Sequence, residues 1–427
     1  MLRLLLLSDI HFLSLYEEMD PHAAVRGSFE KDLSDYRKVH GKIDHILVCG
    51  DIAYKGVKEE YDKARVFFEQ LCDIVGCQPE EIYIVPGNHD KNFYTPNAEI
   101  RHLIHSGLSN EKADPDKLFI DLLSKNFAQF KALYQPFKDY QDFAVRMVSC
   151  EPLMTKCLDK GEDTSYDNEK DKAYIMTRLG TIGSYPLMLY AMNTSLCSDW
   201  YDVNDFEKGH KLFLPKLSYN TKADKEGYIN IAMMHHPSSR LIDGEKIADT
   251  LNKQFQIQIF GHLHQPVSYV NEAVHIHSGA LQPQNDQEDK SEGYFSVYNI
   301  LEMEVISKND EDNLNVQLRV EQYDNDRNEF VEIDEESKNF VLPLKKHKNR
   351  WPKEKSPQIQ PKALPEGVTD RTVKYKFLQL DNPRSIMRRM HYSYDENKSH
   401  NRNCVDFLNK VQSEQRFVEL WDAINQE

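Results

Sequence analysis

The sequence predicts an α/β fold. Short, fully apolar runs alternate with amphipathic helical patterns in the first half of the chain, which is typical of α/β proteins. Five of the apolar runs lead directly into Asp, Asn or His side chains. With 427 residues, 40% hydrophobic and 29% charged, the chain is long enough for one large globular domain with an appendage, or for two to three smaller domains.

The first apolar run, Leu4–Leu7 within the predicted strand Leu2–Leu7, precedes the sequence Ser8-Asp9-Ile10-His11. An export signal needs an apolar core of roughly 7–15 residues and then a cleavage site of small residues. The run is shorter than such an apolar core, and no cleavage site of small residues follows it, so we interpret it as a buried β-strand. No stretch approaches the roughly 18 consecutive apolar residues of a membrane helix, and no membrane partner is expected.

Seven cysteines are scattered along the chain without a Cys-x-x-Cys pair. Their odd number and their spacing argue against a disulfide framework or a zinc finger, and they favour a reducing compartment. We therefore expect a cytoplasmic protein.

Further strands and one helix are predicted from the same periodicities. The segment Glu59–Val75 places apolar side chains on one helical face, and Gly76 follows as a helix C-terminal glycine. The additional strands are expected at Ile46–Cys49, Ile82–Val85, Ile229–Met234, Phe255–Phe260, Val274–His277, Tyr294–Ile300, Leu314–Glu321 and Glu329–Ile333.

Residues 91–172 interrupt the α/β alternation. Asp114-Pro115, a capping residue before a first-turn proline, is predicted to open one long amphipathic helix. Its apolar stripe consists of Phe119, Leu123, Phe127, Phe130, Tyr134 and Phe137. The stripe is expected to pack on the main body, and a helical insertion at this place could also cap a substrate pocket.

The composition changes after about residue 340. Between Lys345 and Lys410 there are 16 Lys and Arg but 7 Asp and Glu, although the whole chain has a formal net charge of −16. The acidic body would repel a polyanion, whereas this basic segment could attract one. We expect a main domain over residues 1–340, and a basic linker with a helical extension over residues 341–427.

Two parts of the extension have distinct patterns. Prolines and lysines in Lys345–Gly367 indicate an extended linker. The apolar residues of Glu414–Gln426 have helical spacing, which predicts a helix that docks on the chain itself or on a protein partner.

Five predicted strands end in side chains that can bind metals. The strand ends are Ser8-Asp9-Ile10-His11, Gly50-Asp51, Pro86-Gly87-Asn88-His89-Asp90, His235-His236-Pro237 and Gly261-His262-Leu263-His264. Ligand sites of α/β sheets lie beyond the carboxyl ends of the strands, where loops converge. The five ends are therefore predicted to place carboxylates, an amide and imidazoles around one crevice.

Local spacing supports a metal site. Asp9 and His11 are separated by one residue. His262 and His264 repeat this spacing. If the chain leaves each strand in an extended conformation, the two members of a pair point to the same side and can bind one ion. Glycines precede three of the strand-end side chains, and they allow tight turns and close approach of the backbone.

The number of candidates indicates two ions. At least seven candidate ligands lie at the strand ends, which is too many for one tetrahedral zinc ion but suits two ions that share a carboxylate. Two metals roughly 3.5–4 Å apart form the clamp that enzymes use for displacement at phosphorus. Mixed imidazole and oxygen ligands favour manganese, iron or zinc over magnesium or calcium. Two divalent ions, with manganese as the first choice, are the expected cofactors.

The ordered motifs D-x-H, G-D, G-N-H-D, H-H-P and G-H-x-H resemble those of the calcineurin-like metallophosphoesterase superfamily. The resemblance covers residues 1 to about 335 in outline and is close at the five blocks between Asp9 and His264. It implies a sandwich of two mixed β-sheets flanked by helices, with a two-metal site at the strand ends. A helical insertion and a C-terminal extension complete the expected fold.

The resemblance also implies a role for each matching residue. One metal would be held by Asp9, His11, Asp51 and His264. The other would be held by the bridging Asp51 with Asn88, His235 and His262. His89 would face the phosphate without binding a metal, and it would protonate the leaving oxygen or stabilise charge, with Asp90 fixing its orientation. His236 is expected to line the substrate pocket or cap the turn.

His275 and His277 have the spacing of a metal-binding pair but lie outside the five blocks. They alternate with Val274 and Ile276 in a strand pattern. We therefore expect them to be strand residues.

By this resemblance, the protein is expected to be a metal-dependent hydrolase in which metal-bound hydroxide attacks a phosphodiester or phosphoanhydride. The segment GDIAYKGVKEEYDKA and the H-H-P block are most similar to the cyclic-nucleotide phosphodiesterase branch, which favours a phosphorylated small molecule as substrate. The first alternative is a nuclease of the DNA-repair type that uses the basic C-terminal arm to bind nucleic acid. The second alternative is an interaction scaffold with a vestigial metal site, which would bind a protein partner through the C-terminal helix.

Overall fold

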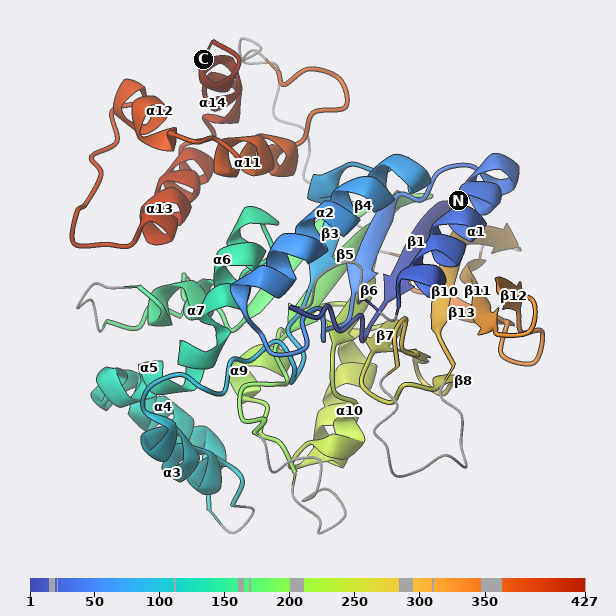
Figure 1. The fold of residues 1–427 in the computed structure, drawn as a ribbon, viewed down its shortest axis with the longest axis horizontal. Helices are drawn as coiled ribbons and strands as arrows, with labels where there is room; N and C mark the ends of the chain where they lie inside the picture. Colours follow the sequence, from blue (N-terminus) through green and yellow to red (C-terminus); the bar gives the residue numbers. More distant parts are fainter. Residues whose placement is uncertain are drawn as a thin grey trace.

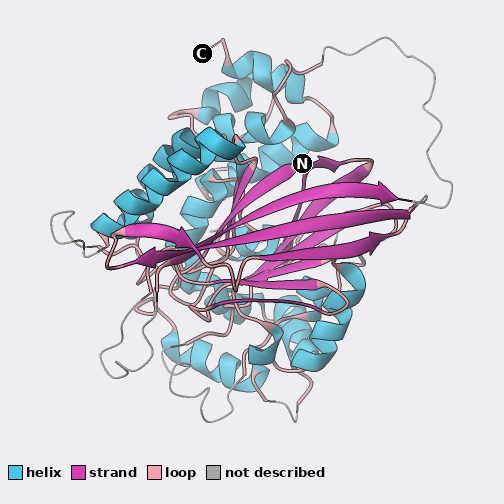
Figure 2. Cartoon of the chain, turned by 90° about the vertical axis from the view of Figure 1, so that its right-hand side faces the viewer, coloured by secondary structure: helices cyan, strands magenta, loops and turns pink. Residues whose placement is uncertain are grey.

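Apolar strands build two β-sheets that pack face to face, and helices cover their outer sides. The structure, a computed structural model, describes residues 1–14, 20, 22–110, 113–159, 165–168, 170–199, 211–283, 295–308, 311–346 and 363–426. Figure 2 shows the strands as a central layer with helices above and below it. This arrangement confirms the predicted α/β sandwich of two mixed sheets.

The first sheet has seven strands in the order β12-β11-β10-β1-β2-β3, and β13 also pairs with β11. The bounds are β1 Leu2–Leu7, β2 His45–Val48, β3 Ile82–Ile84, β10 Val297–Lys308, β11 Glu311–Asp324, β12 Glu329–Glu332 and β13 Lys338–Leu344. Strands β1, β2 and β3 are parallel, whereas β10 is antiparallel to β1. The first three predicted strand ends therefore lie at the same edge of this sheet.

The second sheet has six strands in the order β4-β5-β6-β7-β9-β8. The bounds are β4 Tyr174–Ile182, β5 Tyr185–Met192, β6 Ile229–Met234, β7 Ile257–Phe260, β8 Pro266–Val270 and β9 Val274–Ser278. Strands β5, β6, β7 and β9 are parallel to one another. The ends of β6 and β7 carry the remaining two predicted blocks.

The leucines of β1 explain why this strand is apolar on both faces. Leu4 and Leu6 lie in the apolar layer between the two sheets. Leu5 and Leu7 lie in a second core under the helices that cover the first sheet. All four side chains have no exposed surface, and burial of each contributes roughly 1.5–3 kcal/mol. The run is a central strand, as predicted.

Helices cover both outer faces (Figure 1). On the first sheet these are α1 Ala23–His40 and α2 Lys58–Val75, and on the second α9 Lys216–Tyr219 and α10 Gly244–Gln254. Helix α2 ends at Gly76, whose φ of 82° is left-handed, as predicted for the glycine after this helix. None of the helices in the described ranges combines the length and apolarity that crossing a bilayer requires.

The single long helix predicted after Asp114 is wrong. The segment forms α4 Pro115–Lys125, α5 Phe127–Tyr134 and α6 Lys138–Arg146, preceded by α3 Ala98–Leu108 and followed by α7 Pro152–Cys157. Asn126 leaves the helical region with φ −142°, and Pro136 introduces a short 3-10 turn because it has no N–H to donate. The apolar stripe nevertheless packs on the main body as expected, since all six of its side chains belong to the core under α1 and α2.

The C-terminal helices form a group with its own apolar core. They are α11 Asp370–Leu378, α12 Pro383–Arg389, α13 His400–Ser413 and α14 Phe417–Ile424. Helix α14, predicted as a docking helix, packs on α11 and α12 of the same group. In Figure 1 the group lies at one end of the molecule beside α6, and helix–helix contacts join α11 to α6 and α13 to α7.

Arg371 of α11 is the main polar link between this group and the sandwich. Its guanidinium donates to the carbonyl oxygens of Ile82 and Met147 at 2.8 Å and of Val148 at 2.9 Å. It also lies 4.1 Å from the centre of the Tyr83 ring. Because Ile82 and Tyr83 belong to β3, the C-terminal group is attached to a strand that leads into the G-N-H-D block.

The basic character predicted for the C-terminal region is uneven. The described helices, residues 363–426, contain 10 Lys and Arg and 9 Asp and Glu. The excess comes from residues 345–362, with 7 Lys and Arg against 1 Glu. Of that segment, residues 347–362 lie outside the described residues.

Candidate metal centre

The five predicted strand ends meet at one edge of the sandwich. The Asp9 amide donates to the Gly50 carbonyl at 3.1 Å, which joins the ends of β1 and β2. The Gly261 amide donates to the His235 carbonyl at 3.0 Å, which joins the ends of β7 and β6. The His262 amide, after β7 of the second sheet, donates to Oδ2 of Asp9, after β1 of the first sheet, at 3.1 Å, so the strand ends of both sheets meet in one cluster.

One group of side chains comes from the first and last blocks. Single ligand atoms of Asp9, His11 and His264 all lie within 4.8 Å of one another. Nε2 of His264 is 3.1 Å from Oδ1 of Asp9. This is the set that the resemblance implies for one metal, apart from Asp51.

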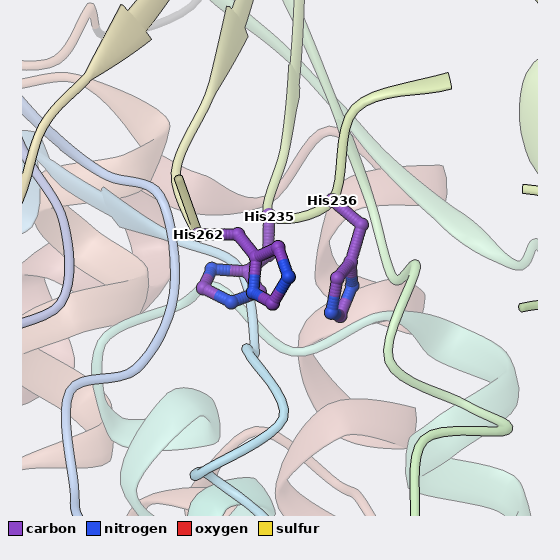
Figure 3. Close-up of side chains that lie close together, drawn as sticks. All are labelled: His235, His236 and His262. Atoms are coloured by element: carbon purple, nitrogen blue, oxygen red, sulfur yellow. The ribbon is translucent and has the colours of Figure 1, made fainter. Parts of the chain in front are cut away.

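A second group lies beside the first. Ligand atoms of His235, His236 and His262 lie within 4.8 Å of one another, and Figure 3 shows the three imidazoles gathered at the ends of β6 and β7. Nε2 of His235 is 3.1 Å from Oδ1 of Asn88. His262 and His264 thus fall in different groups. This separation differs from the shared ion that their spacing suggested, and the resemblance likewise assigns the two residues to different ions.

Asp51 lies between the two groups. Its Oδ2 atom is 3.4 Å from Nε2 of His11 and 3.3 Å from Nε2 of His235. Its Oδ1 atom accepts a hydrogen bond of 2.7 Å from the His89 amide. One carboxylate oxygen therefore faces a histidine of each group, which is the position of a bridging ligand.

These distances fit divalent metal ions. Two ligand atoms each about 2.1 Å from one ion lie about 3.0–3.4 Å apart for bond angles between octahedral and tetrahedral. Asp9 and Asp51 are at most 1% exposed, and buried carboxylates require a compensating positive charge. The donor set of imidazoles, carboxylates and one amide also suits such ions.

The ionisation of the cluster follows from the same proximity. Burial alone would raise the pKa of Asp9, but the charge and hydrogen bond of His264 outweigh it and hold this pKa below its ordinary value. Burial would likewise lower the pKa of His235, but Asp51 outweighs it and raises this pKa to about 9. Asp51 thus favours the positively charged form of His235 when no metal ion is bound.

The backbone at the strand ends is left-handed rather than extended. The φ angle is 51° at Asp9, 52° at His11, 53° at Asp51, 70° at His262 and 55° at His264. The prediction that the paired residues leave their strands in an extended conformation is therefore wrong. Each such residue costs roughly 1–3 kcal/mol, and strain of this kind concentrates at functional sites.

The glycines before the ligands serve close approach, as predicted. A Cβ atom on Gly87 would lie 2.1 Å from Oδ1 of Asp51. A Cβ on Gly261 would lie 2.0 Å from Oγ of Ser8. Any larger residue at either position would displace the loops that bring the candidate ligands together.

Hydrogen bonds at Nδ1 determine which histidine nitrogen faces the cluster. Nδ1 of His235 lies 2.7 Å from the Cys49 carbonyl, and Nδ1 of His11 lies 3.2 Å from the Gln282 carbonyl. A carbonyl oxygen only accepts, so Nδ1 carries the hydrogen in both rings. When the ring is neutral, as a metal ligand must be, its lone pair is then on Nε2, the atom that faces Asp51.

His236 has a different kind of partner. Its Nδ1 lies 3.1 Å from the Thr194 hydroxyl, which can donate or accept, so its tautomer is not determined in the same way. Its backbone amide also donates to that hydroxyl at 2.9 Å. His236 is fully buried beside His262, at a ring separation of 4.5 Å. This places it against the cluster, where the sequence predicted a pocket residue.

His89 is oriented by Tyr54 and not by Asp90. Nδ1 of His89 donates to the Tyr54 carbonyl at 2.9 Å, and the two rings stack with centroids 5.1 Å apart. The predicted direct role of Asp90 in orienting His89 is therefore wrong. Asp90 instead accepts hydrogen bonds from the amides of Ile52, Ala53 and Gly87 and from the Tyr61 hydroxyl, and so it joins the loops after β2 and β3.

Sequence reasoning missed Tyr54, Thr194 and Gln282. Tyr54 lies only three residues after Asp51, but its contribution is a backbone carbonyl and a ring face. Thr194 and Gln282 come from loops without a recognisable motif, after β5 and β9. His275 and His277 are buried residues of β9, as predicted, and stack on Tyr269 and Phe260.

One protein family and several solved structures are similar to this chain. The model of the calcineurin-like phosphoesterase family matches residues 2–266. No curated protein matches the chain. Among solved structures, Vps29 from Chaetomium thermophilum is similar with 10% identity and a TM-score of 0.32, covering 81% of this chain and 100% of that one. A single mutant of Vps29 from Entamoeba histolytica is similar with 11% identity and a TM-score of 0.28, covering 80% and 99%.

Proposed function

The chain belongs to the calcineurin-like phosphoesterase family, and on that premise we propose that it is a two-metal phosphodiesterase that hydrolyses a nucleotide-type diester. Members of this family are generally hydrolases with two divalent metals. The observation that carries the proposal is the position of the Asp51 carboxylate between His11 and His235.

The residues that would hold the two ions come from the two groups and from Asn88, whose Oδ1 atom is 3.1 Å from Nε2 of His235, whereas His236 of the second group would contact the substrate. Asp9, His11 and His264 would bind one ion, and Asn88, His235 and His262 the other, with Asp51 shared. Two such ions, with manganese as the first choice, would activate a water molecule and neutralise charge on the phosphate oxygens. The chain's own residues would orient the ester and move protons.

His89 is suited to protonate the leaving oxygen. Burial lowers the pKa of His89, although Asp51 opposes this. Nδ1 of His89 donates its hydrogen to the Tyr54 carbonyl whether the ring is neutral or protonated. The additional proton of the imidazolium is therefore on Nε2. The imidazolium would pass that proton to the departing oxygen, and the neutral ring would take up another from solvent.

His236 would contact the substrate phosphate. The Thr194 hydroxyl fixes the ring against rotation, and burial, followed by the charges of His262 and His235, holds the pKa of His236 well below its ordinary value. A neutral imidazole whose Nδ1 accepts from Thr194 carries its hydrogen on Nε2 and can donate it to a phosphate oxygen.

A direct assay tests the proposal. The protein with Mn²⁺ should hydrolyse bis-p-nitrophenyl phosphate faster than p-nitrophenyl phosphate, and cyclic nucleotides should be its best natural-type substrates. Asp51→Ala should abolish hydrolysis, and Asp121→Ala, at an exposed residue of α4, should not. Inactivity of the wild-type protein with Mn²⁺, Fe²⁺ and Zn²⁺, or full activity of Asp51→Ala, would refute it.

The nuclease alternative depends on residues 345–362. The C-terminal helices are nearly balanced in charge, and several of their cations already lie over aromatic rings, such as Lys376 over Trp421 at 4.5 Å. If the protein is a nuclease, deletion of 347–362 should remove salt-sensitive DNA binding. The scaffold alternative predicts instead that Trp421→Ala loses a protein partner while hydrolysis is unchanged.

A further inference from the structure

A small cavity lies next to Pro86, the residue before the G-N-H-D block. It is lined by Ile84 of β3 and the following Pro86, by Tyr140 of α6, by Glu151 before α7 and by Asn193 after β5. Its volume is about 10 Å³, which is room for about one water molecule. The cavity thus lies between the helical insertion and both sheets.

Three buried polar groups belong to residues that line this cavity, and these groups have no hydrogen-bond partner among the described residues. They are Oε1 of Glu151, the hydroxyl of Tyr140 and Nδ2 of Asn193. These residues are 5%, 1% and 6% exposed, so bulk water does not satisfy them. An unsatisfied buried polar group is costly, and such groups in native proteins usually bind an internal water.

The three groups have complementary hydrogen-bonding roles. The Tyr140 hydroxyl and the Asn193 amide nitrogen can donate, and Oε1 of Glu151 can accept. A water molecule has two lone pairs and two hydrogens, so one molecule can accept from the first two groups and donate to the third. We propose that this cavity binds a single water molecule through Tyr140, Asn193 and Glu151.

The electrostatic surroundings of Glu151 favour a neutral ligand over a cation. Burial raises the pKa of Glu151 to about 8, and a hydrogen bond from Tyr134 only partly opposes this. The titratable groups that interact with it are Tyr134 of α5, Tyr140 of α6, Cys150, and Cys157 of α7. All four are uncharged at neutral pH, because burial raises the pKa of each above its ordinary value. The carboxyl group is therefore protonated and needs no counter-ion.

The water would support the loop that contacts His236. Asn193 accepts from the Ser195 amide at 2.9 Å through its other side-chain atom, Oδ1. The Ser195 hydroxyl donates to the Pro86 carbonyl at 3.3 Å, next to the G-N-H-D block. Thr194, between Asn193 and Ser195, holds His236. The site therefore braces two loops of the metal centre without touching a candidate ligand.

A crystal structure at pH 6, at a resolution that shows ordered water, tests the site directly. The expected result is one water within hydrogen-bond distance of Tyr140, Asn193 and Glu151. A cavity without density, or direct hydrogen bonds that satisfy the three groups among themselves, would overturn the inference. The site does not depend on the proposed phosphodiesterase activity, so inactivity of the protein would leave this test unaffected.

Protonation of Glu151 has its own test. Its folded pKa of about 8 lies above the ordinary value of 4.5, so the unfolded chain loses this proton first and stability falls as pH rises from about 4.5 to about 8. The substitution Glu151→Gln removes this loss of stability at high pH, because the Gln side chain does not titrate. The melting temperature of the variant should match the wild type near pH 4.5 and exceed it by about 3–6 °C at pH 9.

Two further variants complete the test. Glu335→Gln, at an exposed residue of the β12–β13 turn, should show no such pH-dependent difference. Tyr140→Phe removes one donor to the water and should lower the melting temperature at every pH, with the water lost or displaced in its crystal structure. A Glu151→Gln difference that does not grow with pH, or a Tyr140→Phe protein that keeps an unchanged water, would contradict the site.

Discussion

Oδ2 of Asp51 lies 3.3 Å from Nε2 of His235, and this contact joins the two sheets of the sandwich. Asp51 follows β2 of the first sheet, and His235 follows β6 of the second. The candidate metal centre is therefore built only when the sheets have packed face to face. Loss of packing between the sheets would separate the ligands before it altered any single strand.

Changing one histidine of each group should remove one metal at a time. His264 belongs with Asp9 and His11, whereas His262 belongs with His235 and His236. His264→Gln and His262→Gln should each lower the metal content from about two ions per chain towards one, because the rest of the other group is intact. Elemental analysis after purification with Mn²⁺ measures this.

The exposed His102→Gln is the matched control for both variants and should keep two ions. If either ligand variant retained two ions, or if both lost both ions, the assignment of the two histidines to separate ions would fail.

His89→Gln should slow chemistry without loss of metal. A positioned general acid contributes roughly 10²–10⁴-fold to the rate. The loss of kcat should be large for diesters with alkoxide leaving groups and small for p-nitrophenolate, which needs little protonation. Steady-state kinetics on both kinds of substrate, together with metal analysis, separates this role from metal binding. A large loss of metal in His89→Gln would show that His89 is a ligand instead.

Removing the Arg371 side chain should loosen the C-terminal helices from the sandwich. Arg371→Met deprives the carbonyls of Ile82, Met147 and Val148 of a shared donor, which is expected to cost roughly 2–4 kcal/mol of unfolding free energy. Chemical denaturation measures this, and exposed Arg388→Met is the control. An unchanged stability of Arg371→Met would indicate that apolar contacts alone hold the group in place.

His45 should make the sandwich sensitive to acid. Its Nε2 donates to the Leu179 carbonyl at 2.7 Å and so links β2 to β4 across the two sheets, and burial lowers its pKa to about 4. The unfolded chain takes up this proton near its ordinary pKa of 6.5. The contribution of neutral His45 to the free energy of unfolding is therefore complete above pH 6.5, and it is lost as pH falls from 6.5 towards 4.

His45→Gln keeps a donor for the Leu179 carbonyl but does not titrate. Its unfolding free energy should decrease less between pH 6.5 and 4 than that of the wild type, by roughly 3 kcal/mol. His102→Gln should follow the wild-type curve. Parallel curves for wild type and His45→Gln would contradict the buried, neutral state of His45.

Much of the fold was predictable because its signals are local. Strands such as β1 and β6 were predicted with correct bounds, since a short apolar run between polar residues is itself the sign of a buried strand. Strands β4, β5, β8 and β13 were missed. Strand β4 shows why: most of its residues are partly buried or exposed and it contains Arg178 and Gly180, so it lacks the short, fully apolar run from which other strands were predicted.

The predicted long helix failed for a related reason. The apolar stripe around Phe130 continues with helical spacing through Asn126 and Pro136, so the periodicity does not show where the backbone turns. Only the neighbouring core decides that three shorter helices bury the stripe better than one. The helices α11, α12 and α13 were not predicted individually, because each is short and buries its apolar face only against the others.

The sequence by itself determined the seven candidate ligands, their order and the family, because the chemistry of metal binding restricts which residue types can stand at the strand ends. Tertiary structure alone decided how these ligands are grouped. His262 and His264 are neighbours in sequence but face different partners, since left-handed backbone turns replace the extended chain there. It also decided that Tyr54 orients His89. Every residue type has a backbone carbonyl, so the sequence does not show which carbonyl lies beside His89.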